Sequence, residues 1–165
     1  MKVQIVDYNK NWENYFLYMK EKINKIFNDI KIYHIGSTAV PGLMAKPIID
    51  IMIGVKDDNF LNDTIEPFKK IGFQYISRYE KDIPNRRFFI FKDDSIKYHI
   101  HVVKQGTHWQ KRHIVFRDQL KNNKEVMIRY QNLKIKLSKK EWKDTNEYAD
   151  AKTGFIRSIE KMCNI

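Results

Sequence analysis

Cysteine, proline and glycine are scarce in this chain of 165 residues, which has one cysteine, four prolines and six glycines. Because Cys163 has no second cysteine to pair with, an internal disulfide and a metal site built from cysteines are excluded. No apolar run approaches the ~20 residues of a membrane-spanning helix. The first residues meet charges before a hydrophobic leader could form. We therefore expect a cytoplasmic protein without a membrane partner.

Acidic residues are outnumbered, with 20 Asp and Glu against 31 Lys and Arg, which gives a formal net charge of +11. A basic surface attracts nucleic acid and other polyanions in a general way. Lysines make up 24 of the basic residues, whereas the planar fork of arginine suits phosphate better. The codon bias of an AT-rich genome would produce the same composition. Nucleic acid therefore ranks below a small phosphorylated molecule among the expected partners.

Hydrophobic residues make up 42% of the chain and aromatic residues 13%, which favours a packed core over disorder. The length suits one domain spanning residues 1–165. Apolar periodicity predicts a helix through Phe60 and Phe68, which Pro67 breaks or kinks and Gly72 ends. It also predicts helices at residues 11–29, 109–121, 124–137 and 146–162. Strands are predicted at residues 32–35, 48–55 and 73–77, with a hairpin formed by residues 86–91 and 96–103. Residues 3–6 suit either a short strand or an extended lead-in.

Residues 34–55 combine a Gly-Ser turn after one apolar strand with Asp50 inside the next. Gly36 has no Cβ and tolerates positive φ, so the backbone N–H groups of this turn can approach a phosphate closely. We expect Gly36, Ser37 and Thr38 to bind phosphate. A carboxylate on the neighbouring strand can hold a divalent metal against that phosphate. The segment therefore has the outline of a nucleotide-handling site, although Gly-Ser-Thr also forms plain turns readily.

The same segment carries a family resemblance. Gly36-Ser37, twelve intervening residues and Asp50-Ile51 resemble the signature of the nucleotidyltransferase superfamily, and residues 34–55 as a whole resemble the GrpB family, one of its branches. Later motifs agree in order, namely Arg86-Arg87-Phe88-Phe89, His99-Ile100-His101-Val102, Phe116-Arg117-Asp118-Gln119-Leu120, Tyr130-Gln131-Asn132-Leu133-Lys134, and Tyr148 with Lys152. The resemblance implies an α+β fold, with a nucleotidyltransferase-like mixed β-sheet core, flanking helices and a helical C-terminal part. It implies no settled reaction.

The chain departs from the superfamily pattern at Met52, where an active nucleotidyltransferase would carry its second carboxylate. A thioether is a poor ligand for Mg²⁺, which prefers hard oxygen donors. Either other ligands hold the metal, or the chain keeps the fold and binds its ligand without that chemistry.

Three histidines could supply the missing ligands. Residues i and i+2 share one face of a strand. If the strands are neighbours, as the resemblance implies, His34, His99 and His101 converge with Asp50 near Ser37. The expected cofactor is then a divalent metal, Mg²⁺, Mn²⁺ or Zn²⁺, and a His/Asp set suits Zn²⁺, Mn²⁺ or Fe²⁺ better than Mg²⁺. Alternatively, these imidazoles hydrogen-bond backbone or carboxylate groups and stiffen the sheet, and a one-residue slip would reverse either face.

Three further cations complete the predicted phosphate site. Lys46 precedes Pro47, which holds it extended at the start of the strand that carries Asp50. One of two adjacent arginines points inward, and we assign Arg87 to the phosphate. Lys152 shares a helix face with Tyr148 and could reach across the cleft. The alternatives are a solvated lysine, an edge-strand ion pair and helix packing, respectively.

Two functions follow from these residues. In the first, a nucleotidyltransferase-like enzyme binds a nucleotide or phosphorylated ligand and moves a nucleoside monophosphate to an unknown acceptor, with Asp50 and Ser37 as its catalytic pair. Ser37 would hold phosphate rather than act as a nucleophile, because the second glycine of a serine-hydrolase elbow is missing. In the second, the chain is a catalytically degenerate module that binds a nucleotide or phosphometabolite, as Met52 suggests.

Overall fold

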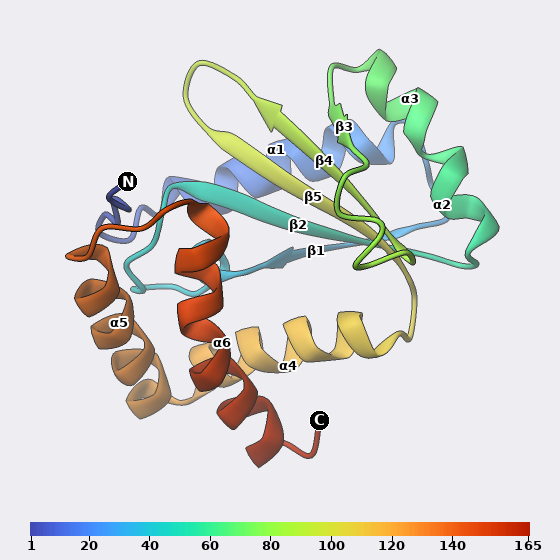
Figure 1. Ribbon diagram of the computed structural model, residues 1–165. Coiled ribbons are helices and arrows are strands. Elements are labelled where there is room, and N and C mark those ends of the chain that lie inside the picture. Colours follow the sequence, from blue (N-terminus) through green and yellow to red (C-terminus); the bar gives the residue numbers. More distant parts are fainter.

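The computed structural model describes all residues from Met1 to Ile165. Its five strands form one sheet in the order β1-β2-β5-β4-β3 (Figure 1). Strands β2 and β5 run parallel, and the other three pairs are antiparallel. The strands are β1 (Lys31–Ile35), β2 (Ile48–Val55), β3 (Gln74–Ile76), β4 (Arg86–Lys92) and β5 (Lys97–Lys104). This mixed sheet agrees with the predicted fold class.

The helices cover both faces of the sheet. Helix α1 packs on one face, and α4, α5 and α6 lie on the other (Figure 1). The short turn η1 (Ser37–Ala39) follows β1 directly. The helices are α1 (Asn11–Asn24), α2 (Asn59–Asp63), α3 (Ile65–Lys70), α4 (His108–Asn122), α5 (Lys124–Ser138) and α6 (Thr145–Met162). No helix combines the length and apolarity needed to cross a bilayer.

Strand β2 decides which side chains reach each face, because successive side chains of a strand point to opposite sides. Ile49, Ile51 and Ile53 are fully buried in the core that α1 completes. Asp50 and Met52 therefore point to the other face, towards α4 and α6. The register places Asp50 beside His99 and Met52 beside His101. The polar groups of the site thus lie on the face opposite the main core.

Several predicted element boundaries differ from the structure. Of the two alternatives for residues 3–6, the strand is not formed: one isolated bridge, from Val6 to Ala45, lies in this segment, and another, from Lys2 to Glu141, lies just before it. Helix α1 ends at Asn24 rather than near residue 29. The chain turns there because Phe27 leaves the helix axis and packs its ring against two phenylalanines of the next helices, Phe60 and Phe68.

The helix expected through Phe60 and Phe68 is divided at Thr64, three residues before Pro67. Pro67 therefore stands in the first turn of α3, where a proline needs no backbone donor. The hydroxyl of Thr64 donates to the carbonyl of Leu61 at 2.7 Å, which satisfies the end of α2. Gly72 follows α3 with φ of +94°, as expected for a residue that ends a helix.

Candidate functional site

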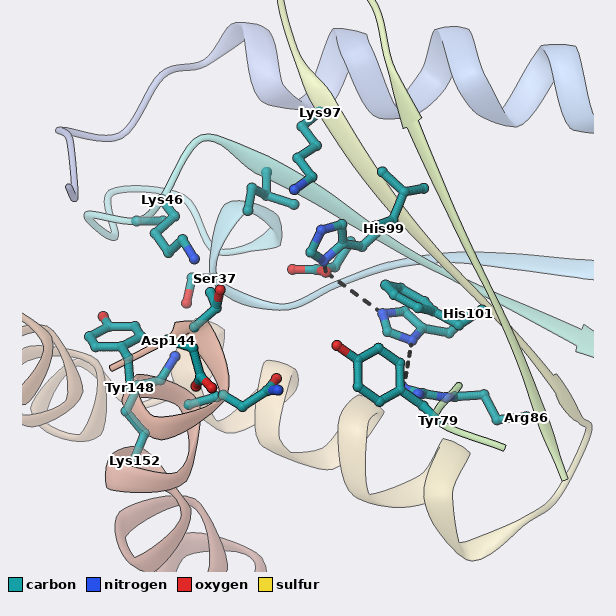
Figure 2. A pocket seen from close by; sticks show the side chains of 18 of the residues that line it. Ser37, Lys46, Tyr79, Arg86, Lys97, His99, His101, Asp144, Tyr148 and Lys152 are labelled. Carbon is teal, nitrogen blue, oxygen red and sulfur yellow. Dashed lines mark hydrogen bonds and ion pairs between the residues drawn. The ribbon is translucent and has the colours of Figure 1, made fainter. Parts of the chain in front are cut away.

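A cleft of about 970 Å³ opens on the polar face of the sheet. The η1 turn, the start of β2, the inward residues of β4 and β5, the loop before β4 and the first turns of α6 line it. Figure 2 shows Ser37, Lys46, Tyr148 and Lys152 at one end of the cleft, with Tyr79 and Arg86 towards the other. Asp50, His99 and His101 lie at its floor, on strands β2 and β5.

The Gly-Ser turn and Asp50 lie against each other, as the spacing predicts. Antiparallel pairing of β1 with β2 sets Ile35 opposite Asp50, so the turn begins directly beside the carboxylate. Gly36 has φ of +73°, and a Cβ added there would lie 2.7 Å from Asp50 Oδ2. Only glycine fits such a conformation and such an approach. Ser37 then starts η1 and lines the cleft.

Thr38 is buried, and its hydroxyl is engaged within the fold. It donates to the carbonyl of Ile48 at 2.9 Å and lies 3.0 Å from Nε2 of His34. Because the hydroxyl proton goes to Ile48, the imidazole of His34 is the donor of the second bond. Thr38 therefore ties the turn to β2, and its hydroxyl is not free to hold a phosphate as the sequence suggested.

The prediction that His34 joins the other histidines around Asp50 is wrong. The register pairs His34 with Ile51, so its side chain points to the face that α1 covers. There its ring stacks on Phe16 at 4.8 Å between centroids. The sequence pattern gave the alternation within each strand, but the pairing of β1 with β2 decides which face His34 occupies.

The other two predicted imidazoles do converge on the carboxylate. Nδ1 of His99 lies 3.6 Å from Asp50 Oδ1, and Nε2 of His101 lies 3.7 Å from the same oxygen. Burial lowers the pKa of His99 to about 4 and that of His101 to about 3, so both rings are neutral at pH 7. Burial also raises the pKa of Asp50, against the opposing pull of His99 and Lys152.

The predicted four-residue metal set is not formed. With His34 on the other face, no group of three or more His, Cys, Asp and Glu side chains has an arrangement that could hold a metal ion. Met52 cannot contribute either. It is fully buried with Ile35 and Val103 in a small apolar cluster between the sheet and α4. Asp50 is therefore the one carboxylate at the centre of the cleft floor.

Four lysines from different elements line the cleft, and we call them the lysine cluster: Lys46, Lys97, Lys134 and Lys152. None of the four lies within 4.0 Å of a carboxylate. The ammonium groups of Lys46 and Lys152 lie 5.9 and 4.5 Å from the ring centroid of Tyr148, which separates them. The fold thus concentrates unpaired positive charge beside the Gly-Ser turn.

Burial and the charge of neighbouring lysines lower the pKa values of Lys134 and Lys152. Burial lowers the pKa of Lys152 to about 8, and the charge of Lys46 lowers it further. Burial likewise lowers the pKa of Lys134 to about 7, with Lys152 as the second cause. The ammonium of Lys134 donates to the carbonyl of Met44. The cluster is therefore charged at a free-energy cost that a bound anion would offset.

The structure assigns the inward arginine to Arg86, so the prediction for Arg87 is wrong. Arg87 donates to the side chain of Asn62 at 2.9 Å and to the carbonyl of Pro84 at 2.8 Å, and it pairs with Glu80 at 3.6 Å. These contacts hold the loop before β4 and occupy the guanidinium. Arg86 instead faces the cleft, where its NH1 group lies 3.2 Å from Nδ1 of His101.

Sequence reasoning left several residues of the cleft lining unassigned, among them Lys97, Arg86 and Lys134. Lys97 stands two positions before His99 and so shares its strand face, a signal that alternation alone supplies. Arg86 stands two positions before Phe88, another residue of the lining. Lys134 follows Tyr130 at a spacing of i, i+4, but nothing in the sequence places α5 beside the loop that precedes β2, where Lys134 lies.

Comparison with solved structures identifies the class of fold. Structures of Cid1 poly(U) polymerase match with a TM-score of 0.53 and 13% identity, over 82% of this chain and 42% of that one, in a complex with Mg and 3′-dATP. This likeness shows a nucleotidyltransferase-like fold. The family model of the GrpB protein matches residues 2–162. The chain therefore belongs to the GrpB family.

Relatives agree with that assignment. The crystal structure of GrpB from Enterococcus faecalis matches with a TM-score of 0.85 and 29% identity, covering 96% of each chain. The glutamate-rich protein GrpB of Alkalihalophilus pseudofirmus is 36% identical, over 95% of this chain and 93% of that protein. YqkA of Bacillus subtilis is 33% identical over 97% of this chain. The match covers only 47% of the length of YqkA. Part of the dephospho-CoA kinase of Mycobacterium leprae is also similar, at 29% identity over 77% of this chain and 37% of that protein.

Proposed function

We propose that this protein binds a nucleotide or another phosphorylated small molecule in the cleft, with the phosphates between the Gly36–Ser37 turn and the lysine cluster. One observation carries the proposal. Lys46, Lys134 and Lys152 are desolvated, and Lys152 is repelled by Lys46 and in turn repels Lys134. No carboxylate lies within 4.0 Å of any of the three, and Asp50 attracts Lys46 and Lys152 only from farther away. Buried charges in proteins are ordinarily paired. A phosphate group of the ligand would supply the missing negative charge.

The turn would contribute neutral donors to the same phosphate. The first N–H groups of a helical turn have no partner inside it, and η1 begins at Ser37. The Ser37 side chain faces the cleft beside Lys46 (Figure 2). Gly36 permits the close packing of this turn on Asp50, since no Cβ could be accommodated there. Backbone donors and ammonium groups would then surround the phosphate from two sides.

Transfer of a nucleoside monophosphate is the second candidate, and the position of Asp50 favours it. A carboxylate beside a phosphate could ligate a Mg²⁺ that arrives with the nucleotide, or accept the proton of an acceptor hydroxyl. Asp50 would act without a second acid, because Met52 stands in that place and is buried. We therefore rank binding above transfer. A small molecule also ranks above nucleic acid, since the unpaired cations line a single cleft.

A panel of ligands tests the proposal. It contains MgATP, MgUTP, dephospho-CoA, pyrophosphate and adenosine, and the measurements are calorimetric affinity and release of pyrophosphate. Dephospho-CoA is included because of the kinase relative. We expect phosphorylated ligands to bind and adenosine to bind far more weakly. MgATP and MgUTP are also incubated with adenosine or dephospho-CoA, whose hydroxyl groups can accept the nucleoside monophosphate. Pyrophosphate release that Asp50→Asn abolishes would support transfer, and nucleotide binding without release in the presence of these acceptors would favour a binding module. Failure of every phosphorylated ligand to bind would contradict the proposal.

Binding should depend on pH in a window that ordinary lysines do not reach. The pKa of Lys134 is about 7 and that of Lys152 is about 8, so both lose charge as the pH rises through this range. Affinity for pyrophosphate should fall accordingly between pH 7 and pH 9, and binding at pH 8 should take up protons. Calorimetry in two buffers with different ionisation enthalpies measures that uptake. An affinity that stays constant over this range would show that neither lysine contacts the ligand.

A further inference from the structure

The contact between Arg86 and His101 determines which ring nitrogen of His101 carries the proton. NH1 of Arg86 lies 3.2 Å from Nδ1 of His101. A guanidinium has five N–H donors and no acceptor, so Nδ1 must present its lone pair. The ring is neutral at pH 7, because burial lowers its pKa to about 3. Its single N–H proton therefore sits on Nε2, the nitrogen that faces Asp50 Oδ1 at 3.7 Å.

His99 approaches the same carboxylate oxygen from a neighbouring position on β5. Its Nδ1 lies 3.6 Å from Asp50 Oδ1, while its Nε2 is buried and has no hydrogen-bond partner. A lone pair on Nδ1 would face a negative oxygen and leave a buried N–H group without an acceptor. Orphaned buried N–H groups are rarer than unpaired acceptors. The favoured tautomer of His99 therefore also directs its proton towards Asp50.

We propose that Asp50 is held between two imidazole N–H groups, and that Arg86 is the positioning residue that keeps a divalent metal ion out of this centre. A histidine that ligates a metal through Nε2 needs the lone pair there and carries its proton on Nδ1. In His101 that proton would point at the guanidinium of Arg86, a contact between two donors. This inference does not depend on the proposed function, because it needs no phosphorylated ligand.

With both imidazole N–H groups directed at one oxygen of Asp50, the other oxygen remains for a ligand. Oδ1 is the oxygen that both imidazoles face, whereas Oδ2 lies beside Gly36. The side chain of Asp50 keeps 30% of its surface exposed. Oδ2 is therefore directed to the turn where the ligand would lie, with its orientation fixed from the opposite side by the two rings. A hydroxyl group of the ligand would meet this oxygen.

Nuclear magnetic resonance tests the tautomer in the wild-type protein. Long-range ¹H–¹⁵N correlation spectra distinguish a protonated from an unprotonated ring nitrogen. We expect His101 to show a protonated Nε2 and an unprotonated Nδ1 at pH 7. A protonated Nδ1 would overturn the proposal, and so would a stoichiometric metal ion on His101 in the purified protein. This measurement needs no variant, so it decides the matter even if substitutions at Arg86 prevent folding.

Variants of Arg86 test the exclusion of metal. In Arg86→Met the donor is lost, and the affinity of the protein for Zn²⁺ should rise by roughly tenfold or more, the size of outer-shell effects in metal sites. The His99 and His101 resonances report this binding in a Zn²⁺ titration. Arg86→Lys keeps a donor and should behave as the wild type does. Arg87→Met, next in sequence and directed away from the cleft, should leave Zn²⁺ affinity unchanged. Equal Zn²⁺ affinity in wild type and Arg86→Met would overturn the proposal. Neither result bears on whether phosphorylated ligands bind.

Discussion

Lys152→Met is expected to stabilise the ligand-free protein while it weakens binding of a phosphorylated ligand. The side chain is half-buried, no carboxylate lies within 4.0 Å of its ammonium, and desolvation lowers its pKa to about 8. Replacing it with an apolar side chain of similar length removes an unpaired charge, which should raise the free energy of unfolding at pH 7 by about 1–3 kcal/mol. Affinity for pyrophosphate should fall by roughly ten- to a hundredfold, since a charged hydrogen bond is lost. Urea denaturation and calorimetry measure the two effects.

The pH dependence of stability gives the same prediction a second readout. Because the pKa of Lys152 is lower in the folded state than the ordinary value of 10.5, the unfolded state binds more protons between about pH 8 and pH 10. The contribution of this group to stability therefore rises with pH in that window. The slope should be smaller in Lys152→Met. Lys161→Met, an exposed lysine on the same helix, is the matched control and should change neither slope nor affinity. A loss of stability and affinity together would mean that Lys152 is a structural residue.

Met52→Asp should destabilise the protein strongly instead of restoring a second acidic ligand. Met52 has no exposed surface and packs with Ile35, Val103 and the partly buried Trp109. An aspartate there would be desolvated without a partner, or would stay protonated, so we expect a loss of about 3–5 kcal/mol in the free energy of unfolding. Met52→Leu keeps the volume and should lose less than about 1.5 kcal/mol.

Urea denaturation of the two variants separates the explanations for position 52. A stable Met52→Asp protein that gains Mg²⁺-dependent release of pyrophosphate would show that the methionine merely replaces a ligand in a competent metal site. We expect the opposite, because the space around residue 52 is apolar and closed by α4.

The sequence predicted the parts of the site that lie within one strand or one turn. Alternation along residues 48–55 separates Asp50 from its apolar neighbours, and the resemblance of residues 34–55 places the Gly-Ser turn beside it. Both features appear in the structure. His99 and His101 also reach Asp50, since their shared face requires only that β5 lies next to β2. Local periodicity was sufficient for these residues.

The other residues of the site are placed by strand pairing and helix packing, which local periodicity does not predict. Register determines that Ile35, and not His34, faces the same side as Asp50. It also sends Arg86 into the cleft and Arg87 out of it. The lysine cluster gathers residues from the loop before β2, from β5, from α5 and from α6. Such a set exists only after the helices dock, so no sequence pattern could reveal its lack of acidic partners.

A crystal structure of the protein with pyrophosphate would show directly whether the cleft binds phosphate. We expect the anion to lie against Gly36 and Ser37, within hydrogen-bonding distance of the ammonium groups of Lys46 and Lys152. Pyrophosphate bound at another surface, with the lysine end of the cleft empty at saturating concentration, would contradict it.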